Sequence, residues 1–119
     1  MIEISIYSCL SSDSEISSLV QDRIYPLTAP EGTIAPYITY QNIIDTALTS
    51  VQGENYAQKT RFQIDIFDKE YLKVLEIAGA VKNALFGLED TVYNFSSRDI
   101  PIEPDTGLYR RLIDFKINN

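Results

Sequence analysis

The chain has 119 residues, about the length of one domain, and its 17 acidic and 10 basic residues give a formal net charge of −7. It contains no His and a single Cys, which excludes histidine-activated nucleophiles, imidazole or thiolate metal sites and an internal disulfide. With 45% hydrophobic and 23% charged residues, the composition is that of a soluble globular domain, and we expect no enzymatic activity.

The first twenty residues carry two competing patterns. Alternating isoleucines at the start favour a strand, whereas Ile2, Ile6 and Leu10 also fit one face of a helix. Ser12–Glu15 matches a capping box, in which a hydroxyl and a carboxylate satisfy free N–H groups at a helix start. We interpret residues 2–20 as two short helices or one broken helix, and whether 2–10 is helix or strand stays open.

A connector and a predicted β-hairpin follow. Residues 21–36 contain three prolines and a glycine, which is typical of a loop. Tyr37–Ile44 is rich in β-branched and aromatic residues, and Arg61–Phe67 alternates between apolar and polar residues, so both stretches predict strands. The polar stretch Asp45–Lys59 between them predicts a long, mobile hairpin loop.

The most regular pattern in the chain lies between Tyr71 and Leu85. Its apolar residues recur at helical spacing and predict one long amphipathic helix. Asp68 is the expected N-cap, and Glu70 in the first turn suits the helix dipole. Gly87 is expected to end the helix in a left-handed conformation.

Two further strands complete the prediction, a short one over 91–95 and a final one over 108–117, separated by a loop over 96–106. Arg111 interrupts the apolar face of the final strand, which places it near an edge of the sheet. Strands joined by short links pair antiparallel. We therefore predict one α+β domain over residues 1–119. It has an N-terminal helical segment, an antiparallel sheet of about four strands, and one long amphipathic helix packed on one face.

Two groups of carboxylates offer the only chemistry-bearing constellations. Asp65, Asp68 and Glu70 lie at a strand–helix junction, where each acid has a local structural role that outweighs a Mg²⁺ or acid–base site. The second group lies in the predicted 96–106 loop and misses the spacing of a calcium-binding loop. We assign no catalytic, cofactor-binding or metal-ligating residues; a small carboxylate-based ligand-binding or metal-dependent domain remains the alternative. The second group comprises Asp99, Glu103 and Asp105.

The distribution of charge bears on nucleic acids and membranes. No Lys or Arg occurs between Ile24 and Gln58, and we see no basic stripe that would bind phosphates tightly. An acidic surface would let DNA pass without holding it. No apolar run reaches the length of a membrane span, and the first ten residues lack the basic start of a signal peptide. We therefore expect a protein made in the cytoplasm, without a membrane partner.

The predicted hairpin loop is the best candidate for a binding surface. Long links between strands are usually trimmed unless they are used. Two interpretations stay open, an unstructured surface loop and a partner-binding arm that orders on assembly. The candidate partner-binding residues are Asp45, Thr46, Thr49, Gln52, Glu54 and Asn55.

Three ordered strings in the first half of the chain are distinctive: Asp22–Leu27, Ala29–Gly32 and Pro36–Gln41. Together they resemble the D-R-I-Y-P … A-P-x-G … P-Y-I-x-Y signature of tail completion proteins from long-tailed bacteriophages and prophages. Arg61–Phe67, followed by a helix, resembles the second block of that family. The resemblance thus covers nearly the whole chain.

The resemblance implies a tail terminator or tail-to-head joining protein. Such proteins are small, non-enzymatic α+β domains without cofactors. They assemble as a ring, typically a hexamer, on the head-proximal end of the tail tube. The implied partners are other copies of the chain, the tail tube protein and the head connector or stopper protein. DNA passes through the lumen without specific binding. The implied location is the tail or neck of a virion assembled in the bacterial cytoplasm.

Two points about the resemblance bear on its interpretation. A head-side connector or stopper ring is the alternative in the same setting. The matched residues also resemble determinants of the fold more than a site. Those residues are Arg23, Tyr25, Pro36 and Tyr37.

Overall fold

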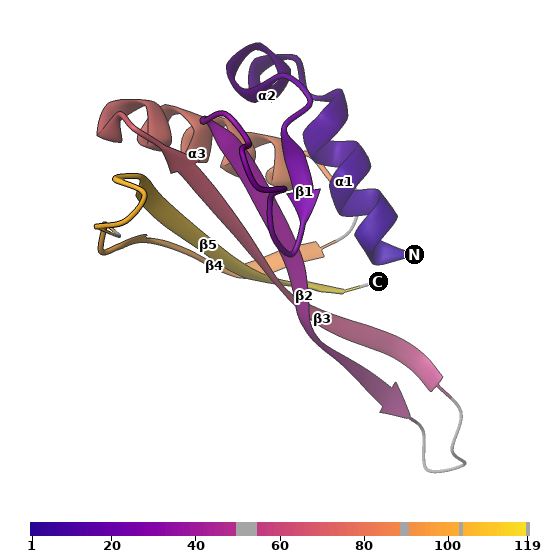
Figure 1. Ribbon diagram of the computed structural model, residues 1–119. Coiled ribbons are helices and arrows are strands. Elements are labelled where there is room, and N and C mark those ends of the chain that lie inside the picture. Colours follow the sequence, from indigo (N-terminus) through magenta and orange to yellow (C-terminus); the bar gives the residue numbers. More distant parts are fainter. Residues whose placement is uncertain (50–54, 89–90, 103, 119) are drawn as a thin grey trace.

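The computed structural model describes residues 1–49, 55–88, 91–102 and 104–118, and it confirms an α+β domain (Figure 1). The chain opens with two helices, as one of the two interpretations predicted. Three strands, a long helix and two more strands follow. In chain order the elements are α1 (Ile2–Ser12), α2 (Ser14–Val20), β1 (Ile24–Pro26), β2 (Tyr37–Thr49), β3 (Asn55–Asp68), α3 (Tyr71–Phe86), β4 (Thr91–Ile100) and β5 (Tyr109–Asn118).

The strands form one sheet in the order β1-β2-β3-β5-β4. β1 runs parallel to β2, pairing Ile24–Pro26 with Ile38–Tyr40, and the other neighbours are antiparallel. The predicted sheet of about four antiparallel strands is therefore a mixed sheet of five. β1 was missed because three residues ending in a proline carry no periodic signal, and only the partner strand defines them.

The three helices lie on one face of the sheet and enclose a single apolar core with it. The even-numbered residues 60–66 of β3 and the odd-numbered residues 113–117 of β5 point into this core, as strand alternation requires. Phe62 and Phe115 are directly paired across the two strands, with their ring centroids 6.0 Å apart. α1 contributes Ile6 and Leu10, which are fully buried. We call the other side of the sheet the open face.

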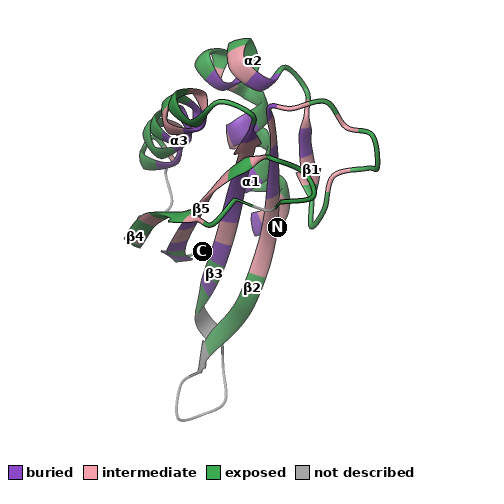
Figure 2. Cartoon of the chain, turned by 60° about the vertical axis from the view of Figure 1, so that its left-hand side comes forward, coloured by how far each residue is buried: buried purple, intermediate pink, exposed green. Residues whose placement is uncertain are grey.

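β2 and β3 run well beyond the rest of the sheet and form a projecting arm, which we define as residues 43–49 and 55–59 (Figure 1). Residues 45–49 and 55–59, predicted as loop, are therefore strand. β5 pairs with β3 only from Lys59 onward, and β1 pairs with β2 only as far as Tyr40. The arm gives the molecule its long axis of 52 Å against 29 and 23 Å. Figure 2 shows buried residues giving way to exposed ones along β2.

Both predicted N-caps are displaced. Asp13, not Ser12, caps α2, because the Asp13 carboxylate accepts a hydrogen bond of 2.9 Å from the N–H of Ile16. Asp68 is the last residue of β3, and its buried carboxylate accepts a hydrogen bond of 3.1 Å from the N–H of Glu70. Sequence spacing located both helix starts to within three residues, as is usual for element boundaries.

The two ends of α3 differ from the prediction in detail. Glu70 occupies the N-cap position rather than the first turn, and its side chain makes no capping hydrogen bond. Gly87 has a φ of −86°, so the helix ends in a right-handed conformation rather than the predicted left-handed one. Its N–H donates to the carbonyl groups of Ala84 and Leu85. The last turn thus tightens toward 3₁₀ geometry, which satisfies the N–H without a left-handed residue.

β4 extends to Ile100, so the first half of the predicted 96–106 loop is strand. Asp99 pairs directly with Arg111 across β4 and β5, with a 2.6 Å contact between guanidinium and carboxylate. The Tyr71 hydroxyl also donates to Asp99, at 2.7 Å. Arg111 lies next to edge strand β4, in agreement with the prediction. The charge that interrupts the apolar face of β5 is thereby neutralised and linked to the start of α3.

Candidate assembly surfaces

The signature strings of the first half build a loop that folds over one end of the open face. The Arg23 guanidinium Nε donates a hydrogen bond of 2.8 Å to the carbonyl of Pro36. The N–H of Ile38 donates to the carbonyl of Arg23 at 2.9 Å, and the N–H of Leu27 donates to the carbonyl of Tyr40 at 2.8 Å. Arg23 therefore holds the residues before β1 and β2 together, which agrees with the structural role that the resemblance implied.

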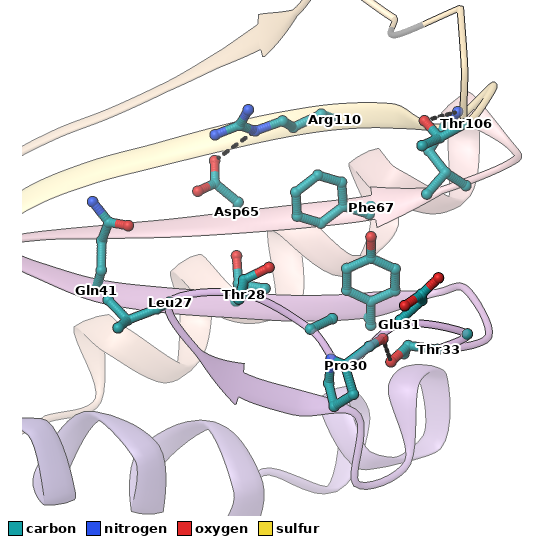
Figure 3. A pocket seen from close by; sticks show the side chains of 15 residues that line it. Leu27, Thr28, Pro30, Glu31, Thr33, Gln41, Asp65, Phe67, Thr106 and Arg110 are labelled. Carbon is teal, nitrogen blue, oxygen red and sulfur yellow. Dashed lines mark hydrogen bonds and ion pairs between the residues drawn. The ribbon is translucent and has the colours of Figure 1, made fainter.

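This loop and the open face enclose a hollow of about 490 Å³ (Figure 3). Its floor is aromatic, because Tyr37 stacks on Phe67 with ring centroids 4.8 Å apart. The Arg110 guanidinium lies 5.5 Å from the centroid of Phe67 and pairs with the Asp65 carboxylate at 3.1 Å. Asp65 is only 5% exposed, and its second oxygen accepts a hydrogen bond of 2.8 Å from Gln63. Asp65 thus has an internal structural role.

The carboxylate groups considered in the sequence do not converge. Asp65 and Asp68 lie three residues apart on one strand, so they point to opposite faces of the sheet. Glu70 is exposed beyond them. In the second group, Asp99 is bound to Arg111 and Tyr71, Asp105 is exposed in a turn, and Glu103 lies outside the described residues. Among the described residues, no group of three or more acids or Cys could hold a metal ion.

A polar network anchors the base of the arm to α1. The Asp45 carboxylate accepts hydrogen bonds from the Thr60 hydroxyl at 2.6 Å and from the Asn42 amide at 3.0 Å. Asn42 also donates to Glu3 at 2.9 Å. The Thr60 hydrogen bond, followed by that of Asn42, lowers the pKa of Asp45 below its ordinary value. Asp45 therefore links the two strands at the base of the arm, and its role toward a partner stays a prediction.

The remaining candidate partner residues are distributed along the arm. Thr46 is exposed and pairs with Lys59, while Thr49 pairs with Asn55 where the described part of the arm ends. Gln52 and Glu54 lie outside the described residues. Within the described chain, the arm strands pair only with each other beyond the reach of β1 and β5. Their outer N–H and C=O groups can therefore accept an added strand from a partner.

The open face gathers basic residues that the sequence did not show as a group. Strand alternation and register place half of the ten Lys and Arg residues there, against only two acidic strand residues. The interpretation that the chain has no basic stripe is wrong for this face. The alternation of β3 and β5 contained part of the signal, but the strand order was needed to bring the residues together. We call this set the basic face: Lys59, Arg61, Arg98, Arg110 and Lys116.

Comparison with known proteins found one matching family and a solved structure with the same fold. The family model described as "Tail completion protein gp17" matches residues 4–118. A chain in the solved structure "Virion of native gene transfer agent (GTA) particle" shares the fold, with a TM-score of 0.67 and 18% identity. The match covers 95% of this chain and 90% of that chain. No curated protein matches the sequence.

One membrane finding accompanies these matches. In the ranges that the structure describes, no helix is both long and apolar enough to cross a membrane. The match over 4–118 takes in both helical and sheet regions, the loop of the signature strings and the arm. The chain therefore belongs to the tail completion protein gp17 family.

Proposed function

We propose that this tail structural protein assembles as a ring, typically a hexamer, on the head-proximal end of the tail tube and joins the tail to the head. The family and the fold support a tail structural role. The ring, its place and its partners are proposed from the resemblance to tail completion proteins, and the shape and chemistry of the surfaces support them.

The projecting arm carries the proposal. A two-stranded ribbon without a covering layer buries little apolar surface and is marginal on its own. Here 12 described residues, 43–49 and 55–59, are extended in this way although the body does not need them. The hydrogen bonds of Asp45 to Asn42 and Thr60 link the two strands where the arm leaves the body. A projecting ribbon with open edges suits contact with the tail tube or the head connector.

Ring assembly requires a heterologous contact, in which two different surfaces of the same chain meet and the rotation closes. A stable contact typically buries about 800 Å² on each partner. The body offers two chemically different sides, a helical layer and an uncovered sheet face. An elongated subunit with distinct sides can therefore form a closed ring and still project an arm from it.

The experiment shortens the arm in an otherwise complete chain. Replacement of residues 49–56 by Asn-Gly joins the paired residues Leu48 and Ala57 through a two-residue hairpin turn and leaves the Asp45–Thr60 contact in place. We expect a folded protein that fails to complete particles in a phage or prophage whose own gene is disabled. Electron microscopy of the particles and thermal melting of the purified variant are the measurements. Glu76→Gln, an exposed change on α3, is the matched control and should complete particles normally.

The phenotype of the disabled gene also separates the proposed roles. Overlong, unattached tails beside filled heads would identify a terminator. Tails of normal length beside heads would favour a joining role or a head-side connector. Normal infectivity with the shortened arm would refute the role of the arm, and normal virions without the gene would refute the proposed function.

A further inference from the structure

We propose that the basic face of one copy packs against the surface of α1 and α2 on the next copy of this chain. The inference rests on the proposed ring and names the two surfaces that meet in it. The evidence for the proposal is that basic residues gather on the open face of the sheet and acidic residues on the α1–α2 side.

The basic face has an unbalanced charge. Among the strand residues of the open face, its five bases stand against two acids, Asp65 and Asp114, a balance of +3 on a chain of net charge −7. Both acids are already engaged: Asp65 with Arg110, and Asp114 with Arg61 at 2.7 Å. Within the described residues, the other bases form no ion pair. Three cations are thus available to a partner: Lys59, Arg98 and Lys116.

Strand register adds a local reason for an acidic partner. Arg61 lies directly opposite Lys116 on the adjacent strands β3 and β5. Like charges in directly opposed positions destabilise a sheet. Asp114 offsets this repulsion on the Arg61 side only. A carboxylate from another molecule, placed near Lys116 and Arg98, would remove the remaining repulsion. Both side chains border the same hollow, of about 330 Å³.

The matching surface lies at the start of the chain. Residues 1–23 contain four acids and one base, Arg23, whose guanidinium donates to the Gln21 side chain and the Pro36 carbonyl. Glu15 on α2 and Asp22 just after it are exposed, and within the described residues neither forms an ion pair. Asp22 also borders a groove of about 440 Å³ between α1 and α2, whose other polar lining includes Ser11 and Ser17. A long Lys or Arg side chain can place its stem in such a groove and its charge on the carboxylate.

α3 belongs to the same helical layer, but it does not offer an acidic surface that matches the basic face. Its region carries two exposed acids, Glu70 and Glu76, among three bases. A surface of mixed sign does not attract a basic face as the α1–α2 surface does. The contact is also heterologous, since a symmetric pairing would set one basic face against another. The three bases of this region are Lys69, Lys73 and Lys82.

DNA is the other polyanion that a basic face could meet. Phosphate binding is strongest where cations are free of competing carboxylates. Here Arg61 and Arg110 are held by Asp114 and Asp65, whose charges repel phosphate. The net charge of −7 opposes the approach of DNA as well. These observations favour a protein surface that contributes a few discrete carboxylates.

The test is a charge exchange in the full chain. Arg98→Glu with Lys116→Glu makes the basic variant, and Glu15→Lys with Asp22→Lys makes the acidic variant. All four residues are exposed, so each variant is expected to melt close to the parent protein. Each pair of changes should lower the yield of completed particles at least about tenfold, the scale of one lost charge pair. The fourfold variant, in which both surfaces are exchanged, should recover most of the yield.

A cross-link gives a second, direct measurement. Arg98→Cys together with Asp22→Cys should give disulfide-linked multimers in assembled particles, and either change alone should not, despite the half-buried Cys9. No recovery in the fourfold variant, together with no cross-link, would overturn the proposed contact. DNA binding that is lost only in the basic variant, with the acidic variant active, would overturn it in favour of a DNA contact. Either result would leave the proposed function standing, because the phenotype of the disabled gene tests that independently.

Discussion

The two faces of the central sheet are built from the same strands but have opposite chemistry. On the helix side, β3 places Phe62, Ile64 and Ile66 in a closed core. On the open face, the same strand places Arg61 and Asp65 in ion pairs that reach the neighbouring strand β5. A sequence period of two therefore separates a face that serves folding from a face for which we propose contact with another copy of the chain. Changes in the core should accordingly affect stability, and changes at the exposed, unpaired cations of the open face should affect assembly.

The largest expected effect is a loss of stability when the core on the helix side of the sheet is disrupted. Phe62→Ala removes a fully buried ring that pairs with Phe115, and leaves a cavity in the core. We expect a loss of about 3–5 kcal/mol in the free energy of unfolding, the usual cost of such a truncation. Urea unfolding followed by circular dichroism measures it. The matched control on the open face is Lys116→Ala, for which a change within about 0.5 kcal/mol is expected. Equal losses for the two variants would contradict the division between faces.

The sequence predicted the helix side of the sheet better than the open face. The core of β3 and the apolar face of α3 were predicted because their periodicity is local and long enough to read. β1, the length of the arm and the basic face were missed, since each depends on which strands become neighbours. Ile24–Pro26 is a strand only because β2 lies beside it, and Arg98 joins Lys116 only through the β4–β5 register.

The candidate site shows the same limit. The sequence located the hairpin correctly but treated Asp45 as part of a loop. The structure makes Asp45 an anchor through its contacts with Thr60 and Asn42. No pattern in the sequence indicates a hydrogen bond between residues 15 positions apart. The sequence lists the charged residues of the open face, but it does not show that they share one surface.

A smaller effect is expected at the buried ion pair of the open face. Arg110→Met preserves the length of the side chain but leaves Asp65 with only the hydrogen bond from Gln63. An unpaired, buried carboxylate destabilises the fold, here by about 1–3 kcal/mol because Arg110 itself is partly solvated. Urea unfolding of Arg110→Met, Asp65→Asn and the double variant forms a thermodynamic cycle. Strict additivity of the two single effects would show that the pair contributes no coupling.

The smallest expected effect is the change in stability at low pH that arises from the carboxyl groups of Asp99 and Asp45. The Tyr71 hydrogen bond, followed by that of Arg111, lowers the pKa of Asp99, and the Thr60 hydrogen bond lowers that of Asp45. A carboxyl group with a lowered pKa in the folded state stabilises the fold above its unfolded pKa, near 4. That contribution disappears as the pH falls through the lower, folded value. Stability should therefore decline below about pH 4.

Replacement of Asp99 or Asp45 by Asn should reduce this loss of stability at low pH. Asp99→Asn and Asp45→Asn each remove one titrating group, so the urea midpoint of either variant should depend less on pH between about 2 and 5 than that of the parent. Asp105→Asn, in an exposed turn, is the control and should retain the parent profile. Because Asp45 lies at the base of the arm and Asp99 does not, only Asp45→Asn should also reduce the yield of completed particles. If Asp99→Asn reduced that yield equally, the polar network at the arm base would not be what orients the arm for assembly.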